Sequence, residues 1–162
     1  MSQLLLALLF CTQAVMAQPP EAKASPVTRD ELVATWEFDG FYFEGNHYPR
    51  PNPNLQVIFE FHQDGTHSLY WARKGELGFC ERRGTFELNG DLLTMRSTWL
   101  NPANDPDCSK DSDMQPGRVT VNRVAWHLCE ESELGNLDLG IEMELNGKPL
   151  TYLLTRSYES RR

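Results

Sequence analysis

Residues 80–99 read CERRGTFELNGDLLTMRSTW, and this stretch decides the fold class. On both sides of Asn89-Gly90, residues that suit a buried face alternate with polar ones. A period of two is typical of a half-buried β-strand, and Asn-Gly between two such runs is a strong hairpin signal. The stretch therefore predicts two antiparallel strands joined by a tight turn.

The same alternation recurs along most of the chain. Further strands are predicted within 36–42, 55–61, 69–71, 119–128, 137–145 and 150–156, and Asp64-Gly65 and Asn146-Gly147 supply two more hairpin turns. Eight sequential strands favour an all-β fold, an eight-stranded antiparallel up-and-down barrel, with a two-sheet β-sandwich as the alternative. In 119–128 the apolar phase switches between Val121 and Val124, which predicts a β-bulge there. A short N-terminal helix is expected over Thr28–Ala34, because Thr28 suits the N-cap position.

The N-terminal segment has the features of a targeting signal. Residues 4–10 read LLLALLF, and small or tolerated residues precede a cleavage site after Ala17. We therefore expect residues 1–17 to be a signal peptide, 18–27 a flexible linker, 28–156 the barrel domain and 157–162 a short tail. This organisation predicts an exported protein that is periplasmic or secreted.

Net charge and hydropathy exclude several classes of partner. The 162 residues carry a formal charge of −8, which disfavours phosphate backbones and anionic lipid surfaces. The apolar run is far shorter than the roughly 20 residues that a membrane span needs. Nucleic acid and a membrane span are therefore not expected.

Counting strands up and down places the long loops 44–54 and 100–117 at one end, which we call the open end. After cleavage three cysteines remain, and export favours one disulfide with one spare thiol. Cys80 and Cys108 fall at the open end on neighbouring segments, whereas Cys129 falls at the closed end. The count predicts a Cys80–Cys108 disulfide and a free Cys129.

Two short motifs resemble the lipocalin family. Ala34-Thr35-Trp36 is similar to its G-x-W motif, and Arg156 matches the arginine that packs across that tryptophan. Residues 59–66, with Phe59, Phe61 and Asp64-Gly65-Thr66, are similar to the second hairpin of small bacterial lipocalin-like (calycin-type) domains. The resemblance implies structural roles for Trp36 and Arg156. Bacterial metalloprotease inhibitors share this small barrel, so the fold leaves the function open.

Five residues are candidates for ligand binding in the upper half of the barrel. Arg82 lies on the apolar face of its strand, where a guanidinium could hold a carboxylate or phosphate; pairing with an internal acid is the other interpretation. Tyr42, Trp71, Trp99 and Tyr152 are expected to line the same half, either as pocket walls or as ordinary core.

No residue pattern indicates catalysis, a metal or a cofactor. Asp105, Asp107, Asp111 and Asp113 lack EF-hand spacing, so they are interpreted as a solvated loop, and the four histidines lack zinc-site spacing. We expect a non-enzyme that binds a small, largely apolar or amphipathic ligand in its barrel. The alternative is a protein-interaction module, such as a periplasmic protease inhibitor, that contacts a protein partner through its open-end loops.

Overall fold

The hairpin expected around Asn89-Gly90 joins β5 (Phe79–Asn89) to β6 (Leu92–Leu100) in the computed structural model, which describes residues 26–128 and 137–157. Leu88 pairs with Leu93 and Asn89 pairs with Leu92, and Gly90 takes the left-handed φ of +61° that this turn requires.

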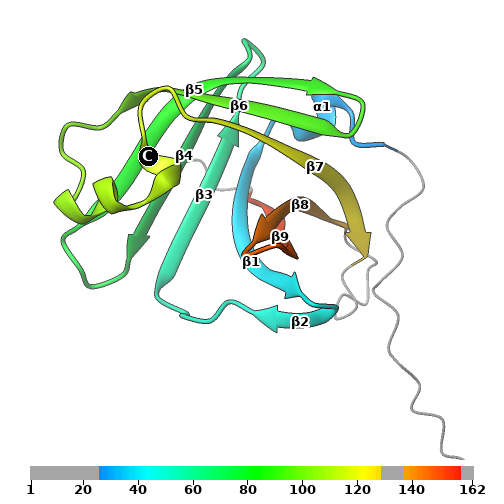
Figure 1. Ribbon diagram of the computed structural model, residues 1–162, viewed down its shortest axis with the longest axis horizontal. Helices are drawn as coiled ribbons and strands as arrows, with labels where there is room; N and C mark the ends of the chain where they lie inside the picture. Colours follow the sequence, from blue (N-terminus) through cyan, green and yellow to red (C-terminus); the bar gives the residue numbers. More distant parts are fainter. Residues whose placement is uncertain (1–25, 129–136, 158–162) are drawn as a thin grey trace, which may run out of the picture.

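Eight strands close into an antiparallel barrel. The others are β1 (Thr35–Phe43), β3 (Leu55–Phe61), β4 (Thr66–Arg73), β7 (Val119–Leu128), β8 (Leu137–Leu145) and β9 (Lys148–Ser157). Each strand pairs with the next, and β9 pairs back onto β1 (Figure 1). The predicted barrel is therefore confirmed, and the sandwich alternative is wrong.

A ninth strand, β2 (Asn46–Pro49), lies within the predicted loop 44–54. It forms a hairpin with the second half of β1, which has left β3 by that point. Both Glu44 and Gly45 adopt positive φ angles at the turn. This strand therefore extends the sheet beyond the closed barrel.

The closed end is sealed by a short helix and a buried tryptophan. The helix α1 (Arg29–Leu32) is shorter than expected and carries a capping box between Thr28 and Glu31. The Trp36 Nε1–H donates to the Leu32 carbonyl at 2.8 Å, and the Arg156 guanidinium lies 5.9 Å from the centre of the Trp36 ring. No helix in the described ranges is long and apolar enough to cross a membrane.

Aromatic side chains fill the closed half of the barrel. Trp36 and Trp126 lie 6.0 Å apart, and Phe61 meets Phe86 edge-on at 5.1 Å between ring centres. Val27, the last residue of the expected linker, is also buried in this core. The interior at this end is therefore packed with side chains.

The wall of the barrel opens beside the first half of β7. Residues 119–123 pair with β6, but pairing with β8 begins only at Arg123. The register is continuous, so the predicted bulge in β7 is wrong. Val119 and Val121 instead face outward and are exposed, and Thr120 pairs with the inward-facing Met95.

Gly84 provides a test of the β5–β6 contact. A Cβ at this position would overlap the Arg96 carbonyl oxygen. We expect Gly84→Ala to lower the free energy of unfolding by about 2 kcal/mol or more, because the strands cannot separate without loss of their pairing. Urea denaturation measures the change, and the neighbouring exposed Thr85→Ala should cost about 1 kcal/mol or less. Equal losses in the two variants would contradict the close packing.

Candidate functional site

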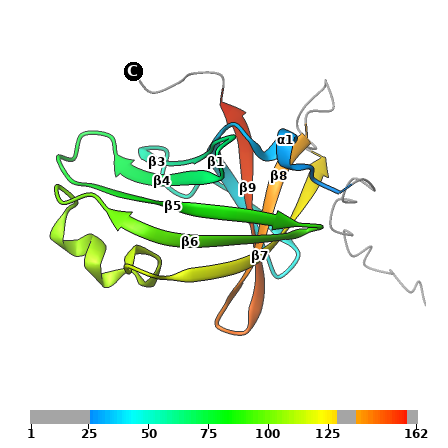
Figure 2. The same cartoon turned by 90° about the horizontal axis from the view of Figure 1, so that it is seen from above.

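The connection from β6 to β7 folds over the open end, and we call residues 101–118 the lid. It contains two 3-10 turns, η1 (Pro106–Lys110) and η2 (Ser112–Met114). The Asp105 carboxylate accepts from the Asp107 N–H at 2.9 Å, and the Asp111 carboxylate accepts from the Asp113 N–H at 2.8 Å. Two of the aspartates predicted to form a solvated loop therefore also shape the lid. Figure 2 shows the lid and α1 at opposite ends of the barrel.

A disulfide ties the lid to the barrel. Cys80 and Cys108 are bonded, with their Cα atoms 5.7 Å apart, as predicted from the strand count. Cys108 and Met114 are buried and form a second apolar cluster with Cys80, against which Trp71 and Leu100 pack. The lid is thus held by a covalent bond and by an inserted methionine. Cys129 lies outside the described residues.

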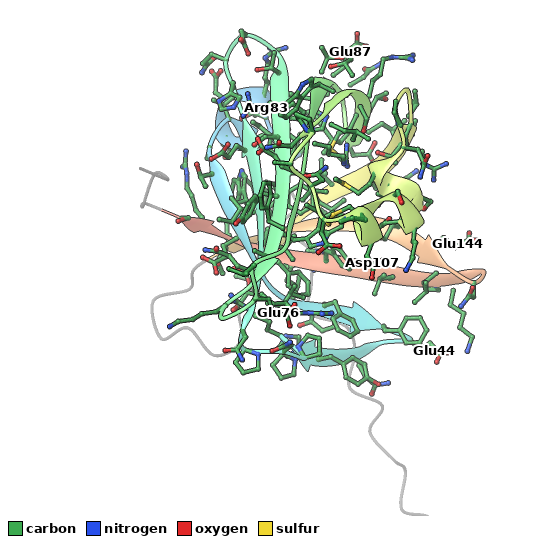
Figure 3. All side chains as sticks on the ribbon, turned by 90° about the vertical axis from the view of Figure 1, so that its left-hand side faces the viewer. Glu44, Glu76, Arg83, Glu87, Asp107 and Glu144 are labelled. Atoms are coloured by element: carbon green, nitrogen blue, oxygen red, sulfur yellow. A yellow bond between two sulfur atoms is a disulfide. The ribbon has the colours of Figure 1, made fainter. Side chains whose placement is uncertain are left out.

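A pocket of about 530 Å³ lies between the lid and the ends of β3, β4 and β5, and we call it the mouth pocket. Its apolar wall is formed by Leu55, Trp71 and the Cys80–Cys108 disulfide. Its charged lining residues are Arg73, Glu76, Asp105, Asp107, Lys110 and Asp111. Figure 3 labels Glu76 and Asp107 at this rim. The pocket therefore combines a short apolar wall with a predominantly charged rim, which suits a molecule with both apolar and polar parts.

Arg82 lies one inward-facing position deeper than Cys80 on β5. Its side chain is 2% exposed, and its Nη1 donates to the Ser97 hydroxyl at 2.9 Å, whereas its Nε has no hydrogen-bond partner. Burial lowers the pKa of Arg82, while Asp113 and Asp111 act in the opposite direction. The predicted interior position is therefore confirmed. The two carboxylates that favour the charged form of Arg82 belong to the lid, and Arg118 of the lid acts against them.

The charges of Asp111 and Asp113 also act on Tyr152, a half-buried residue of β9. Burial raises the pKa of its phenol, and Asp113 and Asp111 raise it further. Tyr152 and Arg82 thus lie within electrostatic range of the same two lid carboxylates, although they come from strands on different sides of the barrel.

The structure brings together only part of the predicted binding set. Trp71 and Tyr152 are half-buried and pack against the interior core. Trp99 instead faces outward beneath the Arg83 guanidinium, which is 4.7 Å from its ring centre. The register of β6 skips Thr98 between Arg83 and Gly84, which places Ser97 inside and turns Trp99 out. The expected inward orientation of Trp99 is therefore wrong.

Tyr42 is also turned outward, by a bulge at Asp39. The register between β1 and β9 shifts from Phe38 to Gly40, so Phe41 takes the inward position and packs against the core. The Tyr42 ring lies 5.1 Å from the His47 ring and 6.1 Å from the His127 ring. The expectation that Tyr42 lines the interior is therefore corrected.

Sequence reasoning missed Leu55, Ser97 and Met114 as parts of this end. The alternating pattern alone does not show that Leu55 and Ser97 belong to a site. A lone apolar residue among aspartates, such as Met114, is a signal for a buried anchor. Met114 packs in one cluster with the bonded Cys80 and Cys108.

Two buried titratable groups lie away from the mouth pocket. Burial lowers the pKa of His67 to about 4, with a smaller contribution from Arg82. Burial raises the pKa of Asp138 to about 6, and the charge of Asp39 adds to this shift. In each case folding shifts the pKa so that the neutral form is favoured relative to the unfolded chain.

No family model and no curated protein matches the chain. The closed eight-stranded barrel, with long loops at one end and a helix-capped tryptophan at the other, is lipocalin-like. Among solved structures, a lipocalin-like protein from Bacteroides uniformis is 17% identical, over 78% of this chain and 98% of that chain, with a TM-score of 0.49. An uncharacterized protein from Bacteroides eggerthii is 13% identical, over 78% of this chain and 99% of that chain, with a TM-score of 0.46.

The two buried groups make opposite contributions to pH dependence. His67 is protonated first in the unfolded chain, so acidification from pH 6.5 to about 4 destabilises the fold. Asp138 keeps its proton longer in the folded state, so raising the pH from 3.8 to about 6 also destabilises it. Each contribution is about 3 kcal/mol when fully developed. Asp138→Asn should therefore steepen the loss of stability on acidification, and His67→Gln should lessen it.

Melting temperatures of the wild type and both variants between pH 4 and 7 measure these slopes. The comparison with the wild type cancels the contributions of all other groups. Parallel curves for the three proteins would contradict the two shifted pKa values.

Proposed function

We propose that the protein binds a small amphipathic molecule at the mouth pocket, with the apolar part of the ligand against Trp71. The observation that carries this proposal is the wall of Leu55, Trp71 and the disulfide inside a pocket with a charged rim. The volume of about 530 Å³ is within the range of drug-sized ligands. The aromatic core already fills the closed half of the barrel, which favours the mouth over the barrel centre. The role is that of a binding protein rather than an enzyme.

The neutral fluorescent probe N-phenyl-1-naphthylamine tests this site, because its emission rises when it leaves water. We expect the wild type to bind it and Trp71→Ala to raise its Kd about tenfold, which corresponds to about 1.4 kcal/mol. Trp99→Ala is the matched control, since that ring faces outward on β6 and should leave the Kd within about twofold. Fluorescence titration measures all three values.

Trp71 also supports the core, so a second variant protects the test against a folding defect. Leu55 is a half-buried residue in the wall of the same pocket, and Leu55→Gln should also raise the Kd of the neutral probe. Near-ultraviolet circular dichroism establishes that each variant is folded. Equal effects of the Trp71 and Trp99 substitutions, or no binding by the wild type, would contradict the proposed site.

Export is part of the same proposal. The Cys80–Cys108 disulfide supports it, because such bonds persist in oxidising compartments. The predicted signal peptide, residues 1–17, lies outside the described residues.

Expression of the full chain in a bacterial host, followed by mass spectrometry, tests export. We expect the mass to lack residues 1–17 and to be lower by two hydrogens for the disulfide. Ala17→Arg should block the cleavage, because signal peptidase requires a small residue at this position. A full-length reduced chain recovered from the cytoplasm would contradict export.

Exposed apolar residues favour protein interaction as the second candidate function. Leu92 and Val121 line a surface pocket beside the opening between β7 and β8, and both are exposed, as is nearby Val119. Exposed apolar side chains beside an unpaired strand edge are typical of surfaces that take up another chain. Failure of the wild type to bind the neutral probe would favour this candidate.

A further inference from the structure

Arg82 is a buried charge without an ion pair among residues 26–128 and 137–157. Its one hydrogen bond goes to the neutral hydroxyl of Ser97, and its Nε–H is buried without an acceptor. A buried guanidinium is costly unless an anion compensates its charge, and no carboxylate of the described residues contacts this one. The Arg82 guanidinium therefore has donors that can hold an anion.

The lid supplies negative charge from above. Asp111 caps η2 and lines the mouth pocket together with Cys80, and Asp113 lies within η2. Met114 of η2 packs in one cluster with Leu100, the residue that is paired with Arg82. The charges of Asp113 and Asp111 oppose the effect of burial on the pKa of Arg82. Met114 is 1% exposed and fixes this part of the lid against the barrel. The Asp113 Oδ1 also lies 3.9 Å from the Arg118 Nε, so Asp113 interacts with this exposed arginine as well.

We propose that Asp111 and Asp113 are a built-in counter-charge for Arg82, which keeps the lid closed until an anionic group on the ligand replaces them. This inference rests on the proposed function, because it assigns the ligand class and the control of the same site. The ligand then combines an apolar body with a carboxylate, sulfonate or phosphate.

The spacing of residues along β5 suits a ligand with an apolar part and an anionic part. Cys80 in the pocket wall and Arg82 are successive inward-facing residues, about 7 Å apart along the strand. A ligand body against Trp71 can therefore place its anionic end near the guanidinium. The free Nε–H and the remaining guanidinium donors suit the paired oxygens of such a group.

The lid has two anchors between which it can move. The disulfide holds Cys108, and at the other end the Gly117 N–H donates to the Ser97 carbonyl while the Ser97 N–H donates to the Arg118 carbonyl, both at 2.9 Å. Gly117 has a φ of +77° at the second anchor, a conformation that glycine adopts without strain. Residues 109–116 include both aspartates and Met114 and lie between these points, so opening of the lid requires Met114 to leave its apolar cluster while the two anchors hold.

A matched pair of probes tests the proposal. 8-Anilinonaphthalene-1-sulfonate has the same rings as N-phenyl-1-naphthylamine and adds one sulfonate. In Asp111→Asn/Asp113→Asn we expect the Kd of the sulfonate probe to fall about tenfold, while the Kd of the neutral probe stays within about twofold. Asparagine at 111 retains the cap of η2. The gain should disappear when Arg82→Met is added.

A second double variant controls for net charge. Asp30→Asn/Glu87→Gln also removes two negative charges, one from α1 at the closed end and one from the end of β5 opposite the mouth pocket. It should change the Kd of the sulfonate probe by less than threefold. An equal gain in both double variants, or a gain that persists with Arg82→Met, would overturn the assignment of a counter-charge while leaving the proposed pocket intact.

The melting temperature of the protein without ligand tests the inference even if neither probe binds. In the wild-type background, loss of both lid carboxylates should lower Tm by about 3 °C, because Arg82 loses its compensating field. With Arg82→Met the same two substitutions should lower Tm by less than half as much. Identical shifts in the two backgrounds would overturn the proposal, whereas absence of binding by the neutral probe would overturn only the proposed function.

Discussion

The pairing of β9 with β1 is the constraint on which the rest of the molecule depends. It runs from Ser157 opposite Thr35 to Leu150 opposite Phe43, and it turns an open meander into a closed wall. Closure gives every strand an inner and an outer face. It also brings Arg156 over Trp36 and places Tyr152 inside, on a wall different from that of Arg82. Without this ladder neither the sealed end nor the mouth pocket would have a defined shape.

Residue alternation and turn chemistry are local, and for that reason they predicted the fold well. Asn89-Gly90 sits at the predicted hairpin, and the strand count correctly paired Cys80 with Cys108. The strand β2 escaped prediction because residues 44–54 contain prolines and no clear apolar face. Its pairing depends on β1 bending away from β3, which is a property of the assembled barrel.

The errors in the predicted site have one physical cause. A single extra residue in a strand reverses the face of every residue beyond it. The bulges at Asp39 and Thr98 do this in β1 and β6, and they turn Tyr42 and Trp99 outward. Gly40, directly after Asp39, is the kind of residue that often marks a bulge, whereas Thr98 has no glycine beside it and its bulge has no signal in the sequence. In β7 the sequence suggested a bulge that the structure does not contain. The apparent change of phase arises because Val119 and Val121 are apolar but face outward and are exposed. Arg82, on a strand whose inward phase runs unbroken from Cys80 to Phe86, was placed correctly.

The polar features of the open end belong to one arrangement. The lid inserts a methionine against the barrel, carries two carboxylates whose charge favours the protonated form of the buried Arg82, and leaves a pocket beside the disulfide. The bond between Cys80 and Cys108 ties the lid to the barrel and is also part of the pocket wall. The thiol–disulfide balance of the surroundings is therefore a component of the site. In a reducing compartment the same sequence would still close its barrel, but it would present a loosely held loop where an oxidising compartment gives it a shaped cavity.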